Sequence, residues 1–404
     1  MAESRAAGTV KGRGRVPVAA RLAASADRFR PHPFVSVMTD DLFTPLTLSE
    51  TTIPNRVMVS PMCQYSCEDR DGLATDWHRV HLGSRAVGGA GVVIAEATAV
   101  EPRGRISPED LGIWSDEHRD ALAPVAEFVT EQGATPGIQL AHAGRKAGTA
   151  RPWEEDRGPL AEDEGGWDPV APSADPYPFE DDPRETHELD EEGIQDVIDS
   201  FRQGARRARE AGFEVAEVHA AHGYLLHEFL SPVANHRDDE YGGSFENRTR
   251  LVREVTEAVR DEWPDDEPVF VRISATDWLD DRDSWDVEQS IRLADDLHEA
   301  GADLVDVSSG GIHPDQDIDW VGPNYQVRFA ERIKAETESD IAVGAVGGIQ
   351  TGEQADALVR NDRADLAIVG RKFLRDPYFP LHAARDLGRE DAIEVPAQYR
   401  RGFQ

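Results

Sequence analysis

Short apolar segments recur along the chain, each followed by a polar loop and then by a stretch whose apolar residues stand three and four positions apart. A continuous run of β-branched and apolar residues predicts a strand buried on both faces, and the wider spacing predicts an amphipathic helix. We expect strands at 56–61, 91–96, 137–142, 215–219, 269–274, 302–308, 341–346 and 364–370. Helices are expected at 116–132, 190–211, 246–263, 286–300 and 326–336.

This alternation of buried strands and helices is typical of a parallel sheet covered by helices. Eight such units agree with a (β/α)8 TIM barrel, an α/β fold that forms one domain of this size. A doubly wound sheet is the alternative, but no G-x-G-x-x-G motif follows the first strand. We therefore predict a single barrel over 39–404.

Candidate chemistry is concentrated where the expected strand at 215–219 runs into His219-Ala-Ala-His-Gly-Tyr224. In a barrel, the carboxyl ends of the strands carry the active site. Two imidazoles three residues apart in a turn can donate two N–H bonds to one oxygen. A polarised carbonyl fits such a pair.

Two other interpretations of these histidines stay open. One histidine can satisfy the backbone at the strand end while the other caps the following helix. A zinc site would need His227 as a third ligand, but the H-E-x-x-H pattern is absent and no cysteine lies nearby in the sequence. We therefore expect no metal ion.

The last two expected strands end in glycine. Gly347 and Gly348 follow one of them, and Gly370 and Arg371 follow the other. Glycine lets a phosphate approach the backbone closely, helix starts behind it leave N–H groups free, and Arg371 can add a charge-assisted bond. The alternative is that these glycines serve only tight turns.

Two further polar residues lie on expected strands. Gln139 offers both a donor and an acceptor, which suits the pyrimidine edge of a flavin. Arg272 brings a fixed positive charge that can stabilise the anion of a reduced ring, and a structural pairing with Asp306 is the alternative. A phosphate site opposite a carbonyl site leaves room for a phosphorylated planar cofactor.

These residues belong to motifs that are specific in combination. They are Ser60-Pro-Met-Cys-Gln-Tyr65, Ile138-Gln-Leu-Ala-His-Ala-Gly-Arg-Lys146, His219-Ala-Ala-His-Gly-Tyr-Leu225, Asn235-His-Arg-Asp-Asp-Glu-Tyr-Gly-Gly243, Glu246-Asn-Arg248 and Val369-Gly-Arg371. Together they resemble the old yellow enzyme family of FMN-dependent ene-reductases, in particular its thermophilic-like bacterial subclass. The resemblance runs from about Leu42 to Phe403.

The resemblance implies a bound FMN, NADPH or NADH as the reductant, and an enone or enal as the small-molecule substrate. It implies that Cys63 tunes the flavin potential. The residues expected to line or hold the flavin are Ser60, Pro61, Met62, Cys63, Ala97, Gln139, Arg272, Gly347, Gly348, Gly370 and Arg371.

For catalysis, the resemblance implies that His219 and His222 hold the substrate carbonyl while hydride passes from flavin N5 to the β-carbon. Tyr224 would then give a proton to the α-carbon, and Tyr65 would shape the substrate pocket. Two alternatives share the fold: a non-catalytic flavin-binding barrel, and a relative that reduces dienoyl thioesters or xenobiotics. The thioester branch carries iron–sulfur and nucleotide domains, and this chain has no set of four clustered cysteines.

Charge is unevenly distributed. The formal net charge is −35, and residues 1–38 hold seven basic and two acidic residues, so 36 basic residues stand against 76 acidic ones over 39–404. A surface rich in carboxylates stays hydrated in concentrated salt, which indicates the cytoplasm of a halophile, and it disfavours nucleic acid. No run of about 18 apolar residues is present to span a membrane.

Three segments lie outside the barrel pattern. The basic segment 1–38 is expected to be a disordered or non-native tail with Met38 as the natural start, and the loop at 145–189 is expected to be a lid or a subunit contact. The resemblance implies a homo-oligomer in which an arginine near the C-terminus reaches a neighbouring site. Arg401 matches it, with Arg400 as the alternative. Two cysteines, Cys63 and Cys67, suit a reducing interior.

Overall fold

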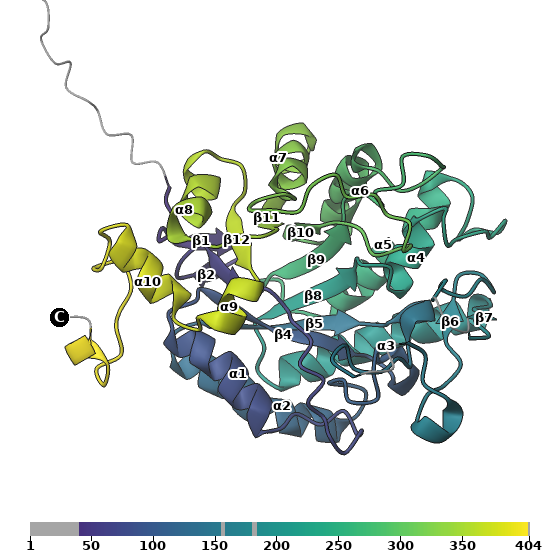
Figure 1. Ribbon diagram of the computed structural model, residues 1–404, viewed down its shortest axis with the longest axis horizontal. Coiled ribbons are helices and arrows are strands. Elements are labelled where there is room, and N and C mark those ends of the chain that lie inside the picture. The colour runs from purple at the N-terminus through teal and green to yellow at the C-terminus, as the bar shows by residue number, and fades with distance from the viewer. Residues whose placement is uncertain (1–39, 155–157, 180–183, 403–404) are drawn as a thin grey trace, which may run out of the picture. The chain divides into compact units, whose positions relative to one another are not determined.

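The computed structural model describes residues 40–154, 158–179 and 184–402, so the expected tail at 1–38 lies outside the described residues. Eight parallel strands close into a barrel in the order β10-β11-β12-β3-β4-β5-β8-β9. The predicted TIM barrel is therefore confirmed, and Figure 1 shows its strands enclosed by helices. The barrel strands are β3 (Val57–Val59), β4 (Val92–Ala99), β5 (Thr135–Ala141), β8 (Val215–Ala220), β9 (Val269–Ser274), β10 (Leu304–Ser308), β11 (Ala342–Val346) and β12 (Leu366–Val369).

Helices cover the outside of the barrel. The five predicted helices are confirmed with each end shifted by at most one residue: α2 (Asp116–Glu131), α3 (Glu191–Glu210), α5 (Phe245–Glu262), α6 (Val287–Glu299) and α7 (Val327–Glu336). The others are α1 (Asp76–Val87), α4 (Leu225–Leu230), α8 (Gly352–Arg360), α9 (Arg371–Arg375) and α10 (Phe379–Asp386), with short 3-10 turns η2 (Pro102–Gly104), η3 (Gly144–Lys146), η4 (Glu162–Glu164) and η5 (Arg400–Gly402). None of the helices in the described ranges is long and apolar enough to cross a membrane.

The α1 helix was not anticipated from the apolar pattern. Its buried face includes His78, His81 and Arg85, which interrupt the run of apolar residues that marks an amphipathic helix. Its start is well defined, because Thr75 is an N-cap whose side chain accepts a hydrogen bond from the backbone of Trp77. Local capping therefore supports a helix that hydrophobic spacing does not reveal.

The barrel interior is layered because alternate residues of each strand point inward. An inner apolar cluster includes Val215 of β8, Phe270 of β9 and Leu304 of β10. Two residues further along the same strands stand Glu217, Arg272 and Asp306, and two residues beyond those stand His219, Ser274 and Ser308. Period-two alternation thus places an apolar layer, a charged layer and a polar layer in that order toward the carboxyl ends of the strands.

A hairpin of β1 (Leu46–Leu48) and β2 (Thr51–Ile53) lies at the opposite end of the barrel. Ile53 is fully buried in the inner apolar cluster, and Leu46 and Leu48 pack against it. The hairpin is tied to residues that precede β9 and β10, because the Glu50 amide donates to the Asp266 carbonyl and the Ser49 hydroxyl donates to Asp303. The hairpin therefore covers the amino-terminal end of the barrel.

The long loop predicted at 145–189 carries its own short elements in its described part. These are η4 and a two-stranded parallel pair formed by β6 (Val170–Ala171) and β7 (His187–Glu188). Its aromatic side chains pack toward the carboxyl ends of the barrel strands: Trp153 meets Tyr65 edge to face with ring centroids 5.6 Å apart, and Tyr177 lies against Lys146. The loop therefore forms part of the rim of the barrel mouth.

Candidate active site

The histidine pair sits at the end of β8, as the sequence predicts. The ring centroids of His219 and His222 are 5.2 Å apart and nearly perpendicular. The Nδ1 atom of His219 accepts a hydrogen bond from the Ala221 amide at 3.3 Å, so its proton is on Nε2. Nε2 of His222 lies 2.7 Å from the hydroxyl oxygen of Ser308. If that hydroxyl donates, Nδ1 of His222 carries the proton, and each ring offers one N–H.

Electrostatics keep both rings neutral. Burial lowers the pKa of His219 and of His222 well below the usual value, and the nearby positive charges of Arg272 and Lys146 lower both further. A neutral imidazole donates one hydrogen bond whose direction depends on the tautomer. Both rings are therefore neutral, and with the Ser308 hydroxyl donating to His222 Nε2 the pair presents two N–H donors, a suitable arrangement for an oxygen that gains negative charge.

The turn that carries the pair has an uncommon backbone conformation. His222 has φ of 61° and Gly223 has φ of 70°. A Cβ atom at Gly223 would lie 2.1 Å from the carbonyl oxygen of Gly311, so only glycine fits there. Lys146 stabilises the same turn, because its Nζ donates to the carbonyls of His222 at 2.9 Å and Gly311 at 3.2 Å.

Tyr224 is the residue at the start of α4. Its ring is 5.0 Å from that of His219, and the Lys146 Nζ lies 4.9 Å from its ring centroid. Burial raises the pKa of Tyr224 well above its usual value, as do the neighbouring Cys63 and Asp110. The phenol therefore stays protonated over the ordinary pH range and can serve as a proton donor.

Cys63 and Tyr65 follow β3 and lie near Tyr224. Burial raises the pKa of the Cys63 thiol, and the charges of Asp110 and Glu96 raise it further. Burial likewise raises the pKa of Tyr65, with further contributions from Cys63 and Tyr224. Cys63 is therefore a neutral thiol at the barrel mouth. Cys63 and Cys67 are both free.

The charged layer lies directly beneath the histidines. Arg272 donates from Nη1 to the Ser60 hydroxyl at 3.2 Å, and its Nε is 3.3 Å from Asp306 Oδ2. The alternative predicted for Arg272, a pairing with Asp306, is therefore present together with its contact to Ser60. The Nε2 of Gln139 donates to Glu217 Oε1 at 2.7 Å. Burial raises the pKa of both Glu217 and Asp306, and the charge of Arg272 opposes this rise.

Several features fit a flavin. Because the Gln139 amide nitrogen faces Glu217, its carbonyl oxygen can accept from a ring N–H. Ala97 is the register partner of Gln139, directly after a bulge in β4. A Cβ atom at Gly370 would have only Met62 Sδ and Ser60 Cβ near it, both at 3.8 Å, so the backbone there is open to a ligand.

The phosphate end is formed by segments after β11 and β12. No side chain caps the first turn of α9 at Gly370, and Arg371 is exposed there. Burial raises the pKa of Tyr325, while the charges of Arg371 and Arg272 oppose the rise, so this phenol lies within electrostatic reach of both arginines. An anionic group bound beside the exposed Arg371 would meet its positive charge.

The glycines after β11 have a structural reason of their own. Gly347 and Gly348 have φ of 136° and 73°. A Cβ atom at Gly348 would lie 2.5 Å from the Gly322 carbonyl oxygen, and one at Gly347 would lie 2.9 Å from Gln326 Cβ. Packing against residues 322–326 therefore requires glycine at both positions, whether or not a phosphate binds. Their predicted contact with a phosphate stays a prediction.

One predicted substrate residue lies apart from this cluster. Arg401 is exposed in η5 near the C-terminus, and the segment after α10 is drawn in yellow in Figure 1. Pro61 and Met62 are half-buried beside Ser60. The chain therefore brings together the predicted residues of the barrel mouth, whereas the role of Arg401 in a neighbouring subunit stays a prediction.

Sequence reasoning missed several polar partners. Glu217 was not singled out, although an acid between apolar neighbours on a buried strand is an available signal. Ser308 was predicted only as the end of a strand and Lys146 only as the end of a motif, and Tyr325 was not identified. In the described part of the chain, no group of three or more His, Cys, Asp or Glu side chains is arranged to hold a metal ion.

Comparisons with known proteins cover most of the chain. The model of the NADH:flavin oxidoreductase / NADH oxidase family matches residues 41–390. The chain is 47% identical over 367 residues to a NADPH dehydrogenase of Bacillus subtilis (strain 168), covering 91% of this chain and 100% of that protein. Among solved structures, morphinone reductase in complex with tetrahydroNAD is 29% identical, with a TM-score of 0.69 over 88% of this chain and 93% of that one. An old yellow enzyme homologue from Zymomonas mobilis is 27% identical, with a TM-score of 0.70 over 86% and 93% of the two chains.

Proposed function

Because the chain belongs to the NADH:flavin oxidoreductase / NADH oxidase family, whose members use FMN and NADH or NADPH, we propose that it reduces the C=C bond of α,β-unsaturated carbonyl compounds. The observation that carries this proposal is the pair of neutral imidazoles of His219 and His222 beside the protonated phenol of Tyr224. Such a set can bind a carbonyl oxygen and supply a proton nearby.

FMN, when bound, supplies the hydride that is received from NADH or NADPH and delivered to the substrate. We propose that Gln139 and Ala97 contact its ring, that Arg272 lies at its pyrimidine edge, and that Gly370 and Arg371 hold its phosphate. The buried contact of Arg272 with Ser60 and Asp306 supports this role, because it fixes the direction of the guanidinium. The neutral thiol of Cys63 would lie beside the ring without adding a charge.

The histidine pair would bind the substrate carbonyl. Negative charge develops on that oxygen as the β-carbon accepts hydride, and the two N–H donors stabilise it most in the transition state. Their neutrality matters, because an imidazolium would transfer its proton rather than hold it. The serine at position 308 supports the role of His222, because its hydroxyl faces the second ring nitrogen.

Tyr224 would give the proton to the α-carbon. Its raised pKa makes the phenol a weak acid in the free enzyme, and the proton is needed only once a basic carbon centre forms. Lys146 lies over the ring, and burial lowers the lysine pKa to about 8. A positive charge at that place would stabilise developing negative charge on the phenol oxygen.

An absorbance titration tests the proposed function. Purified protein is reduced anaerobically with NADPH and then mixed with cyclohexenone. A flavin band that bleaches with NADPH and returns with the enone is expected, with saturated ketone as the product. Bleaching without recovery on addition of enone would support reduction of the flavin by NADPH but contradict the proposed reduction of enones. It would favour the alternative that reduces dienoyl thioesters or xenobiotics, whereas a flavin band that NADPH does not bleach would favour the non-catalytic barrel.

A further inference from the structure

His227 contacts the backbone of the turn that carries His222 and Tyr224. It lies in α4, and its Nδ1 accepts a hydrogen bond from the amide of Gly223 at 2.8 Å. Gly223 stands between His222 and Tyr224, so this bond anchors the middle of the turn that carries both. A ring nitrogen that accepts a hydrogen bond has no proton. The ring proton of His227 must therefore be on Nε2.

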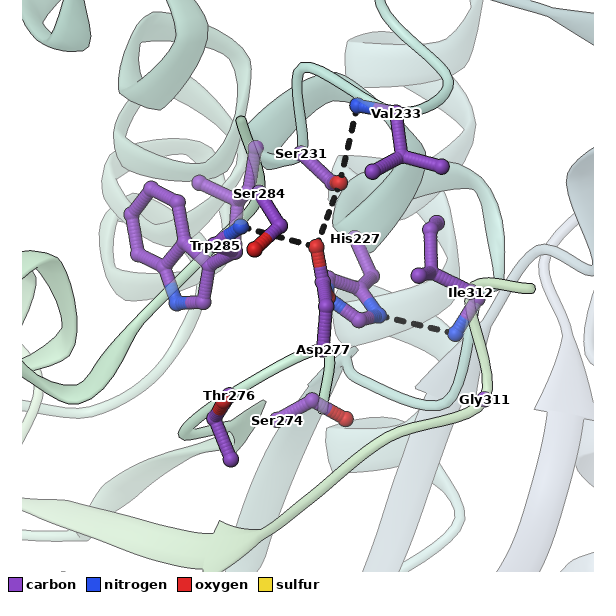
Figure 2. A network of polar contacts seen from close by, with 12 residues as sticks. His227, Ser231, Val233, Ser274, Thr276, Asp277, Ser284, Trp285, Gly311 and Ile312 are labelled. Carbon is purple, nitrogen blue, oxygen red and sulfur yellow. Dashed lines mark hydrogen bonds and ion pairs between the residues drawn. The ribbon is translucent and has the colours of Figure 1, made fainter. Parts of the chain in front are cut away.

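Asp277 faces that second nitrogen. Its Oδ1 is 2.9 Å from His227 Nε2, with the oxygen off the N–H axis, and neither side chain has any exposed surface. Its Oδ2 accepts from the Ser231 hydroxyl at 2.6 Å and from the Trp285 amide at 2.8 Å, as Figure 2 shows. These two bonds fix the carboxylate in place. A fixed carboxylate accepts but cannot donate, so it favours the His227 tautomer with the proton on Nε2.

The turn needs such support. His222 and Gly223 both have left-handed backbone angles, with φ of 61° and 70°. A non-glycine residue in this region is strained and persists only where its surroundings hold it. Besides the bond from Lys146 to the His222 carbonyl, the turn has two other supports. The His222 amide donates to the Ser274 hydroxyl at 2.9 Å, and the Tyr224 amide donates to the Ala221 carbonyl at 3.2 Å. The bond to His227 supports Gly223, the residue between His222 and Tyr224.

We propose that Asp277 is a positioning residue for the substrate site. It fixes the tautomer of His227, whose free ring nitrogen holds the Gly223 amide and thereby places His222 and Tyr224. The inference rests on the proposed function of that pair. The effect passes through the close contact of the Asp277 carboxylate with His227 Nε2 and through the hydrogen bond from Gly223 to His227 Nδ1. Asp277 touches neither substrate nor cofactor.

The test is Asp277→Asn in the FMN-loaded protein. An asparagine can satisfy the Trp285 amide only by turning its NH2 group toward His227, which forces the ring proton to Nδ1 and sets two donors against each other at Gly223. The matched control is Ser290→Ala. It removes a buried partner of the Trp285 indole, at 2.7 Å in the same region, without touching His227.

Two measurements separate positioning from a general loss of stability. Amide hydrogen exchange at Gly223, with 15N NMR of His227, reports the turn and the tautomer. Titration with 4-nitrophenolate, an oxyanion that two N–H donors can bind, reports the histidine pair. We expect D277N to expose the Gly223 amide, to move the proton to Nδ1 and to weaken phenolate binding by up to about 100-fold. S290A should change neither.

The outcomes are distinct. A D277N protein with unchanged Gly223 exchange or unchanged phenolate affinity would overturn the positioning role, as would equal changes in S290A. Failure of the unmodified protein to bind phenolate would instead overturn the proposed function, and with it the role of Asp277. If D277N does not fold, Ser231→Ala, which removes one bond to Oδ2, must shift the same two readouts in the same direction, and no shift would overturn the inference.

Discussion

Neutral side chains dominate the barrel mouth. His219, His222, Cys63 and Tyr224 all have pKa values displaced by burial in the direction that keeps them uncharged. Charge is held one layer deeper, at Arg272 and its acidic neighbours. A substrate oxygen that gains charge therefore meets oriented dipoles first, and these cost little to keep in a buried site.

At the residue scale, His219→Ala tests one of these dipoles. Loss of one donor to a developing oxyanion typically costs about 2.7–4 kcal/mol of transition-state stabilisation. We expect enone reduction to slow by about 100- to 1,000-fold. Reduction of the flavin by NADPH should slow far less. Stopped-flow measurement of the two half-reactions gives the comparison. Equal slowing of both would count against a carbonyl-binding role.

Glu228→Gln tests a buried acid beside the site. Burial raises the pKa of Glu228 to about 8, against opposing effects of Arg145 and Lys146. The folded state thus holds a proton that the unfolded state loses near pH 4–5, so this residue contributes stability at low pH that is lost as pH rises toward 8. We expect the variant to flatten the fall in unfolding free energy over that window by about 1.4 kcal/mol per pH unit. Urea unfolding at several pH values measures it, and an unchanged slope would show that Glu228 is already ionised.

At the element scale, the turn after β8 and the loop after β10 hold each other. Gly223 and Gly311 pack backbone to backbone, and a Cβ atom at Gly311 would lie 2.5 Å from the carbonyl carbon of His222. The two strands on either side of β9 thus contribute one rigid edge, since β8 and β10 both pair with β9. The position of the histidine pair depends on this contact as much as on the strand itself.

Gly223→Ala, with Gly133→Ala as its control, measures that contact. Both glycines have positive φ, of 70° and 83°, but a Cβ atom at Gly133 would meet nothing within 4 Å. In the control, the free energy of unfolding should fall only by the cost of placing a non-glycine residue in the left-handed conformation, about 1–2 kcal/mol. In the Gly223 variant, the free energy of unfolding should fall clearly more, and the affinity for phenolate should also fall. Urea unfolding gives the difference, and equal losses would show that the loop simply moves away.

Most of the fold was predictable because the barrel strands are continuous apolar runs and the long helices are strongly amphipathic. The missed elements are those whose stability comes from elsewhere. The α1 helix buries His78 and Arg85, and the β1–β2 hairpin has strands of three residues that pack only once the barrel exists. The strand predicted at 56–61 shortened to Val57–Val59, since the residues beyond it turn into the mouth.

The site was predictable where its residues are adjacent in the chain. His219, His222 and Tyr224 share one turn, so their proximity follows from local geometry. The partners of this turn were not predictable, because Ser308 and Asp277 reach it only through the closure of the barrel. No local pattern distinguishes a buried aspartate that orients a ring from one that caps a helix.

At the scale of the whole molecule, charge is the outstanding property. The net charge of −35 gives a surface whose acidic groups repel one another at low ionic strength. We expect the midpoint of thermal unfolding to rise as KCl increases from about 0.1 M to about 2 M, because salt screens this repulsion. Differential scanning calorimetry measures the midpoint. A constant or falling midpoint would show that the acidic surface does not limit stability.

A second whole-molecule prediction concerns assembly. Arg401 is exposed, and Arg400 beside it makes an ion pair with Glu394 at 3.0 Å. If Arg401 completes a neighbouring site, Arg401→Ala should raise KM for the enone with little change in flavin content, and Arg400→Ala should not. Steady-state kinetics together with light scattering test both. The same KM in R401A and in the unmodified protein would remove the shared site.

The hairpin that covers the amino-terminal end of the barrel has a kinetic consequence. With Ile53 buried in the inner cluster, the described residues close this end of the barrel and leave the opposite end, which the long loop borders, for ligands to approach. If the reductant and the oxidant also occupy the same site beside the histidine pair, they exclude one another, so initial-rate plots at several fixed concentrations should give parallel lines. At high concentration, each reactant should also inhibit the reaction by competing with the other for this site.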